Sequence, residues 1–207
     1  GMAQERPLAF AIAASDSSIL YASSGAGWVY RSDSWGERWL RLENRPSTSP
    51  VMALAVDPRR SGVVYAGSSS GVHRSADGGQ TWQRVHDAPV TALAIDGRTG
   101  DIYAADSRGG VWRSDASAAT WVRAGLDTAE VVTLVVAQSG QTGNARSLLF
   151  AGTSNQGVYL SQDAGASWLP LGGAIAPYVQ ALALHPAAPG DILVATSNGL
   201  YVRTLDR

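Results

Sequence analysis

The amino-acid sequence predicts an all-β fold, a β-propeller of about five four-stranded antiparallel blades in which the last blade has three strands. Three observations lead to this fold class. A short motif that ends in tryptophan recurs at Trp39, Trp82, Trp121 and Trp168, a period of roughly 40–50 residues that is typical of propellers and solenoids. Short apolar runs bounded by Gly, Ser, Asp or Asn recur in step with it, as strands joined by turns do. No stretch keeps a helical period over a useful length.

Each repeat begins with three recognisable strands. The first strands read PLAFAIA, VMALAVD, VTALAID, VVTLVVA and VQALALH, the second ILYAS, VVYAG, DIYAA, LLFAG and ILVAT, and the third WVYRS, GVHRS, GVWRS, GVYLS and GLYVR. A fourth strand is expected to start at each recurring Trp. Because the repeats fill nearly the whole chain, we expect one domain over residues 1–207. Its repeats cover residues 7–50, 51–89, 90–130, 131–178 and 179–207.

The fifth repeat ends just past its third strand, so the last blade is predicted to have three strands and an unpaired edge. Such an edge invites pairing with another chain. We favour a small propeller with an incomplete last blade, and the alternative is an open arc that pairs with a second copy. The apolar run PLAFAIA resembles the core of a signal peptide, but it aligns with four later first strands and is assigned to the fold.

The recurring motif has the form S-x-D-x-G-x-[TS]-W, and it resembles the Asp-box, or BNR repeat, of sialidases and other propellers. The second copy matches in full and the fourth has Ser in place of Thr. The first copy has Ser34 at the Asp position, and the third has Ala116 and Ala118 at the Asp and Gly positions. The matching residues are Ser32, Gly36, Trp39, Ser75, Asp77, Gly79, Thr81, Trp82, Ser114, Thr120, Trp121, Ser161, Asp163, Gly165, Ser167 and Trp168.

We interpret the box as a structural turn. A short Asp side chain accepts backbone N–H bonds across a turn and Gly supplies a positive φ, while Trp fills space between adjacent sheets. The resemblance places the box on the hairpin between the third and fourth strands, away from ligand sites. Two of the four copies lack the Asp, which argues against a shared catalytic or metal-binding role.

Composition excludes several classes of function. The net charge of −1 is scattered along the chain, so no electrostatic footprint for nucleic acid or an acidic membrane is present. The chain has no Cys, which excludes disulfides, thiol catalysis and Cys-based zinc sites. No apolar run is long enough to cross a membrane. We expect a soluble protein, cytoplasmic by default, with no cofactor and no metal.

The sequence offers no catalytic set. Sialidases that share the box use three arginines on one carboxylate, whereas Arg31, Arg74 and Arg113 fall at equivalent places in three third strands and therefore on separate blades. We interpret them as surface or inter-blade ion-pair partners. A glycosidase needs two carboxylates about 5–10 Å apart, and Asp87 and Asp127 lie in equivalent loops, but solvated acids are the favoured interpretation. We expect no enzyme activity, with glycoside hydrolysis as the alternative.

Propellers bind most often through the loops at one end of the channel, here the fourth-to-first connections and the second-to-third turns. The side chains expected in these loops are mostly polar and include Arg and Tyr, a combination that suits the binding of peptides or sugars. The candidate binding face consists of Arg45, His86, Asp87, Asp106, Arg108, Asp127 and Tyr178.

Two functions remain open. The first is a non-catalytic module for protein interaction or assembly, because the repeats are similar to those of photosystem II assembly-factor propellers and sortilin-type receptors; its partner is another protein, or a second copy bound through the open last blade. The second is a carbohydrate-binding or degenerate glycosidase-like propeller. Trp35, in the degenerate first box, is the Trp left over for stacking on a glycan.

Overall fold

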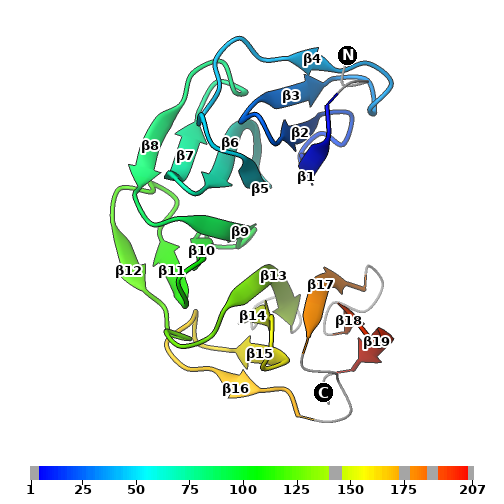
Figure 1. Ribbon diagram of the computed structural model, residues 1–207, viewed down its shortest axis with the longest axis vertical. Coiled ribbons are helices and arrows are strands. Elements are labelled where there is room, and N and C mark those ends of the chain that lie inside the picture. The colour runs from blue at the N-terminus through cyan, green and yellow to red at the C-terminus, as the bar shows by residue number, and fades with distance from the viewer. Residues whose placement is uncertain (1–4, 140–145, 173–177, 186–190, 205–207) are drawn as a thin grey trace.

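The structure is a computed structural model that describes residues 5–139, 146–172, 178–185 and 191–204. Its strands form five antiparallel sheets arranged around a common axis, and in every sheet the strands follow one another in sequence order (Figure 1). The first four sheets have four strands and the last has three. The prediction of a five-bladed β-propeller with a three-stranded last blade is therefore confirmed.

The sheets are named blades 1 to 5 in chain order. Blade 1 comprises β1 (Pro7–Ile12), β2 (Leu20–Ser24), β3 (Val29–Ser32) and β4 (Leu40–Arg41). Blade 2 comprises β5 (Val51–Asp57), β6 (Arg60–Ser68), β7 (Gly71–Ser75) and β8 (Gln83–His86). Blade 3 comprises β9 (Val90–Ile95), β10 (Ile102–Asp106), β11 (Val111–Ser114) and β12 (Trp121–Arg123).

Blades 4 and 5 complete the set. Blade 4 comprises β13 (Val131–Ser139), β14 (Arg146–Thr153), β15 (Val158–Ser161) and β16 (Leu169–Pro170). Blade 5 comprises β17 (Val179–Leu184), β18 (Ile192–Thr196) and β19 (Gly199–Arg203). The first strand of each blade lies nearest the axis, and in blades 1 to 4 the fourth strand lies at the rim (Figure 1).

The core lies between blades, where the facing sides of neighbouring sheets pack together. Side chains alternate along a strand, so the first strand sends branched apolar residues toward the preceding blade and alanines toward the following one. At the seam of blades 2 and 3, Tyr65 and Val72 of blade 2 pack against Val90 and Ile102 of blade 3. At the seam of blades 3 and 4, Ala92 and Ala94 of blade 3 pack against Leu134 of blade 4.

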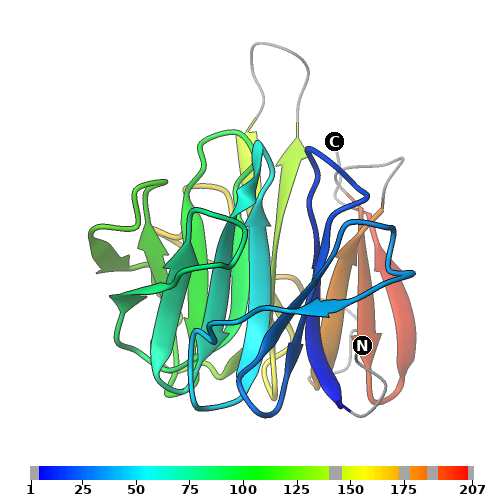
Figure 2. The ribbon, with the colours of Figure 1, turned by 90° about the horizontal axis from the view of Figure 1, so that it is seen from above.

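The circle of blades has an open side. Successive first strands contact one another from β1 to β5, β9, β13 and β17, whereas no comparable contact joins β1 to β17, both of which the structure describes. Figure 1 shows β1 and β17 facing each other across this side, and Figure 2 shows that the strands of blades 1 and 5 run in the same general direction. The five blades therefore form an arc with two end blades.

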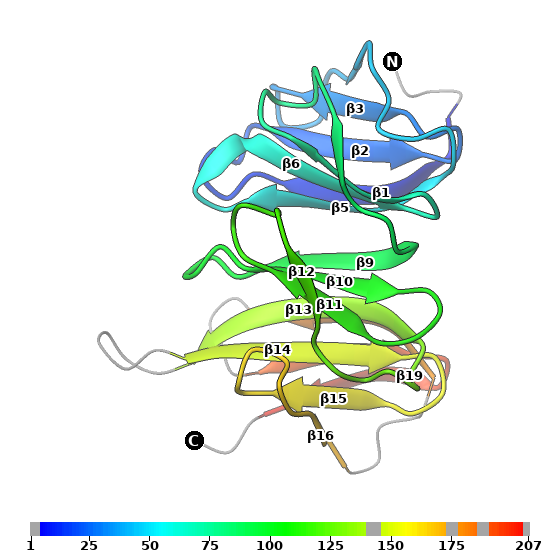
Figure 3. The ribbon, with the colours of Figure 1, turned by 90° about the vertical axis from the view of Figure 1, so that its left-hand side faces the viewer.

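The strands of every blade run between the same two ends of the molecule (Figure 3). One, the loop end, carries the second-to-third turns and the fourth-to-first connections. The other, the box end, carries the first-to-second turns and the Asp-boxes. Within the described residues, no helix is long and apolar enough to span a membrane.

Candidate functional site

The second Asp-box is a turn held by its own side chains. The Gly79 N–H donates to Ser75 Oγ at 2.8 Å, and Ser75 Oγ donates to Asp77 Oδ1 at 2.7 Å. Thr81 donates its N–H to Asp77 Oδ1 at 2.9 Å and its hydroxyl to Oδ2 at 2.5 Å. These bonds, those from Thr81 first, lower the pKa of Asp77 to about 2. Asp163 is held in the same way by Ser167, and its pKa is also lowered to about 2.

The two degenerate boxes keep the turn with other residues. In the first copy Ser34 takes the place of the Asp and accepts the Arg38 N–H at 3.0 Å. In the third copy Asp115, one position earlier, accepts both the N–H and the hydroxyl of Ser117. Ala118 stands at the Gly position and adopts the left-handed conformation with φ 57°. Because the turn survives these changes, the bonding supports a structural interpretation of the box.

The loop end of blade 3 holds a cluster of charged and aromatic side chains around Asp106. This carboxylate, the last residue of β10, is fully buried and accepts bonds from Arg108 Nε and Nη2, both at 3.1 Å. Trp112 Nε1–H donates to it at 3.1 Å, and Arg123 Nη2 lies 3.8 Å away. Burial opposes ionisation of Asp106, but the bonds from Arg108 and Trp112 outweigh it and lower its pKa.

Arg123 joins this carboxylate to the aromatic part of the cluster. Its guanidinium lies over the Trp112 ring, 4.4 Å from the centroid, and 3.5 Å from Asp127 Oδ1. It also donates to the Gly109 carbonyl at 2.8 Å. We call Asp106, Arg108, Trp112, Arg123, Asp127 and the neighbouring His86 the loop-end cluster.

His86 connects the cluster to blade 2. Its ring stacks on Trp121 with centroids 4.8 Å apart and meets Trp112 edge-on at 4.7 Å. Burial lowers the pKa of His86, and the charges of Arg123 and Arg108 lower it further, against the opposing effect of Asp106 and Asp87. His86 is thus part of the aromatic seam between blades 2 and 3.

The structure brings four of the seven predicted face residues together: His86, Asp106, Arg108 and Asp127. The other three lie outside this group, although Asp87 directly follows His86 and its charge acts on that imidazole. Asp87 is exposed and pairs with Arg84 at 3.1 Å. Arg45 lies on blade 1, with its guanidinium 5.3 Å from the centroid of Trp28. Tyr178, which precedes β17, is 58% exposed.

Sequence reasoning missed Trp112 and Arg123. Trp112 stands in the third-strand run GVWRS, and its Nε1–H reaches Asp106. Arg123 stands two residues after a recurring Trp, as Arg41 and Arg84 do. This regular placement on three fourth strands was the sequence signal that could have identified Arg123. Arg41 likewise lies over an indole, 4.5 Å from the centroid of Trp28.

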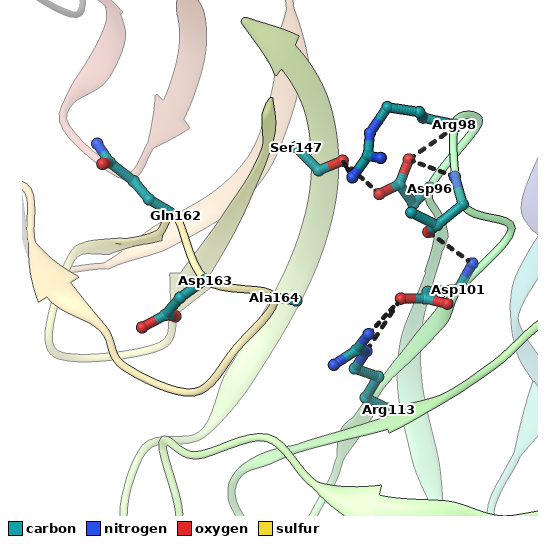
Figure 4. Close-up of a pocket in the computed structure, with 9 residues that line it drawn as sticks. Asp96, Arg98, Asp101, Arg113, Ser147, Gln162, Asp163 and Ala164 are labelled. Atoms are coloured by element: carbon teal, nitrogen blue, oxygen red, sulfur yellow. Dashed lines mark hydrogen bonds and ion pairs between the residues drawn. The ribbon is translucent and has the colours of Figure 1, made fainter. Parts of the chain in front are cut away.

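A polar cavity of about 290 Å³ lies at the box end between blades 3 and 4 (Figure 4). Asp96 at its edge accepts the backbone N–H groups of Arg98 at 2.8 Å and Thr99 at 3.3 Å, together with the hydroxyl of Ser147. These bonds lower the pKa of Asp96 although burial opposes them. Beside it Arg113 forms an ion pair with Asp101, with 2.6 Å between Arg113 Nη2 and Asp101 Oδ2. Both buried acids are thus already satisfied by the protein.

The third-strand arginines are engaged within their own blades. Besides the Arg113 pair, Arg31 lies 2.8 Å from Asp33, and Arg74 donates to the Tyr65 hydroxyl at 3.2 Å. Within the part of the chain that the structure describes, no group of His, Asp and Glu residues is placed to hold a metal ion.

Comparison with known proteins gives structural neighbours only. No family model matches the sequence, and no curated protein is significantly similar to it. An ancestral GH74 enzyme shares 20% identity with a TM-score of 0.72, over 97% of this chain and 31% of that one. The GH74 xyloglucanase from Xanthomonas campestris shares 18% identity with a TM-score of 0.70, over 96% and 37%. YCF48 bound to a D1 peptide shares 13% identity with a TM-score of 0.65, over 96% and 63%.

This chain therefore spans less than two thirds of each of these neighbours. At such low identities the likeness shows the fold alone. The neighbours include GH74 enzymes and a peptide-bound protein, YCF48, and what they share with this chain is the fold. The chain is a β-propeller, the fold that its Asp-box repeats predict.

Proposed function

We propose that this chain is a non-catalytic interaction module that binds a segment of a partner protein at the loop-end cluster. The observation that carries the proposal is the buried carboxylate of Asp106, which fixes Arg108, Arg123 and Trp112 in place. The Arg108 side chain is nevertheless 66% exposed. Arginine and tryptophan held rigidly at a surface are the residues that most often dominate binding energy, and rigidity reduces the entropic cost of binding.

The acids of the cluster are poor candidates for catalysis. A general acid at neutral pH needs a raised pKa, whereas the pKa of Asp106 is lowered. Asp87 and Asp127, the two loop acids weighed as a catalytic pair, each form an ion pair with an arginine of their own blade. A neighbour of the same fold, YCF48, is known in a complex with a D1 peptide, which supports peptide binding over hydrolysis.

The proposal is tested by capture of partners on immobilised protein at two salt concentrations, with identification by mass spectrometry. We expect one stoichiometric partner that wild-type protein retains at moderate salt and that Arg123→Ala loses at least tenfold. Arg98→Ala, which removes an arginine from the box end, is the matched control and should retain the partner. Equal capture by all three proteins would place binding elsewhere.

Carbohydrate binding is the second candidate, and one observation favours it. The indole of Trp35 is 69% exposed in the first box, so it is free to stack on a sugar ring, and two neighbours of the same fold are GH74 enzymes, one of them a xyloglucanase. Titration with xyloglucan oligosaccharides, followed by calorimetry, tests this. Binding that Trp35→Ala abolishes and Arg123→Ala leaves intact would replace the peptide proposal.

A further inference from the structure

We propose that the loop end of blade 1 binds a carboxylate between Arg41 and Arg45, beside the indole of Trp28. This inference does not depend on the loop-end cluster, which lies on blade 3 and at its seam with blade 2. It rests on a comparison of repeats. Blade 1 keeps an arginine that blade 3 pairs with its own acids, and it has other residues in place of both acids.

The loop ends of blades 1 and 3 share their backbone hydrogen bonds, so their residues can be matched one to one. In each blade one bond closes the second-to-third turn and another joins the third strand to the residue after the fourth. These bonds run from N–H to C=O and are Ser24 to Trp28 and Leu42 to Val29 in blade 1, and Asp106 to Gly110 and Ala124 to Val111 in blade 3. Ser24 therefore matches Asp106, and Arg41 matches Arg123.

In blades 2 and 3 the arginine at this position is paired with acids of its own blade. Arg84 of blade 2 lies 3.1 Å from Asp87. Arg123 of blade 3 lies 3.5 Å from Asp127 and 3.8 Å from Asp106. None of these acids comes from a neighbouring blade, so the comparison concerns only what blade 1 itself contains.

Blade 1 has neither of the acids of blade 3. Ser24 takes the place of Asp106. Arg45 takes the place of Asp127, since each lies four residues beyond the arginine of its fourth strand. Among the described residues, neither Arg41 nor Arg45 lies within ion-pair distance of a carboxylate. Two positive charges therefore stand where blade 3 combines one positive charge with two negative ones.

Both guanidinium groups are held on one indole. Arg41 lies 4.5 Å and Arg45 lies 5.3 Å from the centroid of Trp28, and Arg45 Nη1 donates to the Ala26 carbonyl at 3.4 Å. Stacking on an aromatic ring leaves the N–H groups at the edge of a guanidinium available to an acceptor. The hydroxyl of Ser24 is buried and has no hydrogen-bond partner among the described residues, and a buried polar group is costly unless it is paired.

These donors suit a carboxylate. A guanidinium presents its N–H groups in a planar fork that matches the two oxygens of a carboxylate, and an anion between two like charges offsets their repulsion. Blade 3 indicates the same chemistry, because Asp106 and Asp127 lie beside the matching arginine. The Glu5 carboxylate is engaged with Tyr30, since burial raises the pKa of Tyr30 and the charge and hydrogen bond of Glu5 raise it further. The ligand is therefore a carboxylate of another molecule.

The site is tested by NMR titration of isotope-labelled protein with glutarate, at constant ionic strength with chloride as the balancing anion. We expect saturable shifts of the Trp28 indole N–H and the Arg41 Nε–H signals, with a millimolar Kd. Arg41→Gln and Arg45→Asp should each weaken binding about tenfold or more, the second because it places an internal acid where blade 3 has Asp127. Arg84→Gln, at the position of Arg41 in blade 2, is the matched control and should bind glutarate as wild-type protein does.

Two further ligands, inorganic phosphate and a peptide with blocked ends and a single Glu, are titrated in the same way. Binding of the peptide identifies an acidic side chain of a protein as the source of the carboxylate, and binding of glutarate alone identifies a free acid. Phosphate that binds more tightly than either would overturn the assignment to a carboxylate. Wild-type protein without saturable shifts would overturn the proposal, as would binding that survives both variants or that Arg84→Gln weakens equally. The spectra show whether each variant is folded, and none of these outcomes bears on capture at the loop-end cluster.

Discussion

Asp77 accepts both hydrogen bonds that Thr81 can donate, one from its backbone N–H at 2.9 Å and one from its hydroxyl at 2.5 Å. The two bonds reach different oxygens of the same carboxylate, Oδ1 and Oδ2. The pair closes the hairpin between β7 and β8, and Ser167 repeats it on Asp163 in blade 4.

Removing the carboxylate should weaken this turn without destroying it. The first box works with Ser34 in the same place, so Asp77→Ala is expected to lower the Tm by only about 2–4 °C, and Asp77→Ser by less. Thermal unfolding followed by circular dichroism checks this. An Asp77→Ala variant with the wild-type Tm would mean that the turn is held by packing alone.

Stability should fall in acid because of the same two carboxylates. The pKa values of Asp77 and Asp163 are lowered to about 2 in the folded state from an ordinary 3.8. Their contribution is therefore complete above about pH 4 and is lost as the pH falls toward 2. The Tm of wild-type protein, measured between pH 5 and pH 2, should drop more steeply than that of the double variant Asp77→Asn/Asp163→Asn. Parallel curves would contradict this assignment.

The buried carboxylate of the loop-end cluster should matter more to stability than the exposed one. Asp106→Ala leaves Arg108 and the Trp112 N–H without their acceptor, at an expected cost of about 2 kcal/mol in the free energy of unfolding. Asp127→Ala is the control, because its exposed ion pair with Arg123 contributes roughly 0–1 kcal/mol. Urea denaturation measures both. Equal losses would show that the cluster is not organised around Asp106.

Removing a glycine from one box and introducing a glycine in another should change the free energy of unfolding in opposite directions. Gly79 has φ 91°, and a Cβ there would lie 2.3 Å from Leu42 Cδ1, so Gly79→Ala is expected to cost about 1–3 kcal/mol. Trp35 adopts φ 56° although it is not glycine, and its equivalent in the second box is Gly78. Trp35→Gly should therefore stabilise the protein by about 0.5–1 kcal/mol, as measured by urea denaturation. A loss of stability in Trp35→Gly would show that the indole packs in solution.

The sequence predicted the strands well because their pattern repeats. Val51–Asp57 was expected as a strand and is one, since alternation and turn residues agreed in every copy. The limits of strands were predicted less well where turn chemistry decides them. The strand β6 begins at Arg60, ahead of the run VVYAG, because Asp57 and Arg60 pair across a tight turn and Arg60 also binds the Asp57 carboxylate at 2.6 Å.

The candidate site was predicted only in part, for a physical reason. Topology alone places Asp106 and Asp127 at the same end, because both follow from the order of strands. Which of them is buried depends on the side chains packed around it. The indole of Trp112 reaches Asp106, whereas His73, at the same repeat position in blade 2, has a ring nitrogen left without a partner. An alignment of the repeats treats Trp112 and His73 as equivalent, so it does not show which of them hydrogen-bonds to a neighbouring carboxylate.

The open side also determines how the molecule loses its structure. Among the described residues the main contacts between blades join neighbours in sequence, so the arc behaves as a linear array whose units are coupled to the next one along. In the part of the chain that the structure describes, each end blade packs against one other blade and blade 5 has three strands, so amide protons of β18 should exchange sooner than those of β10.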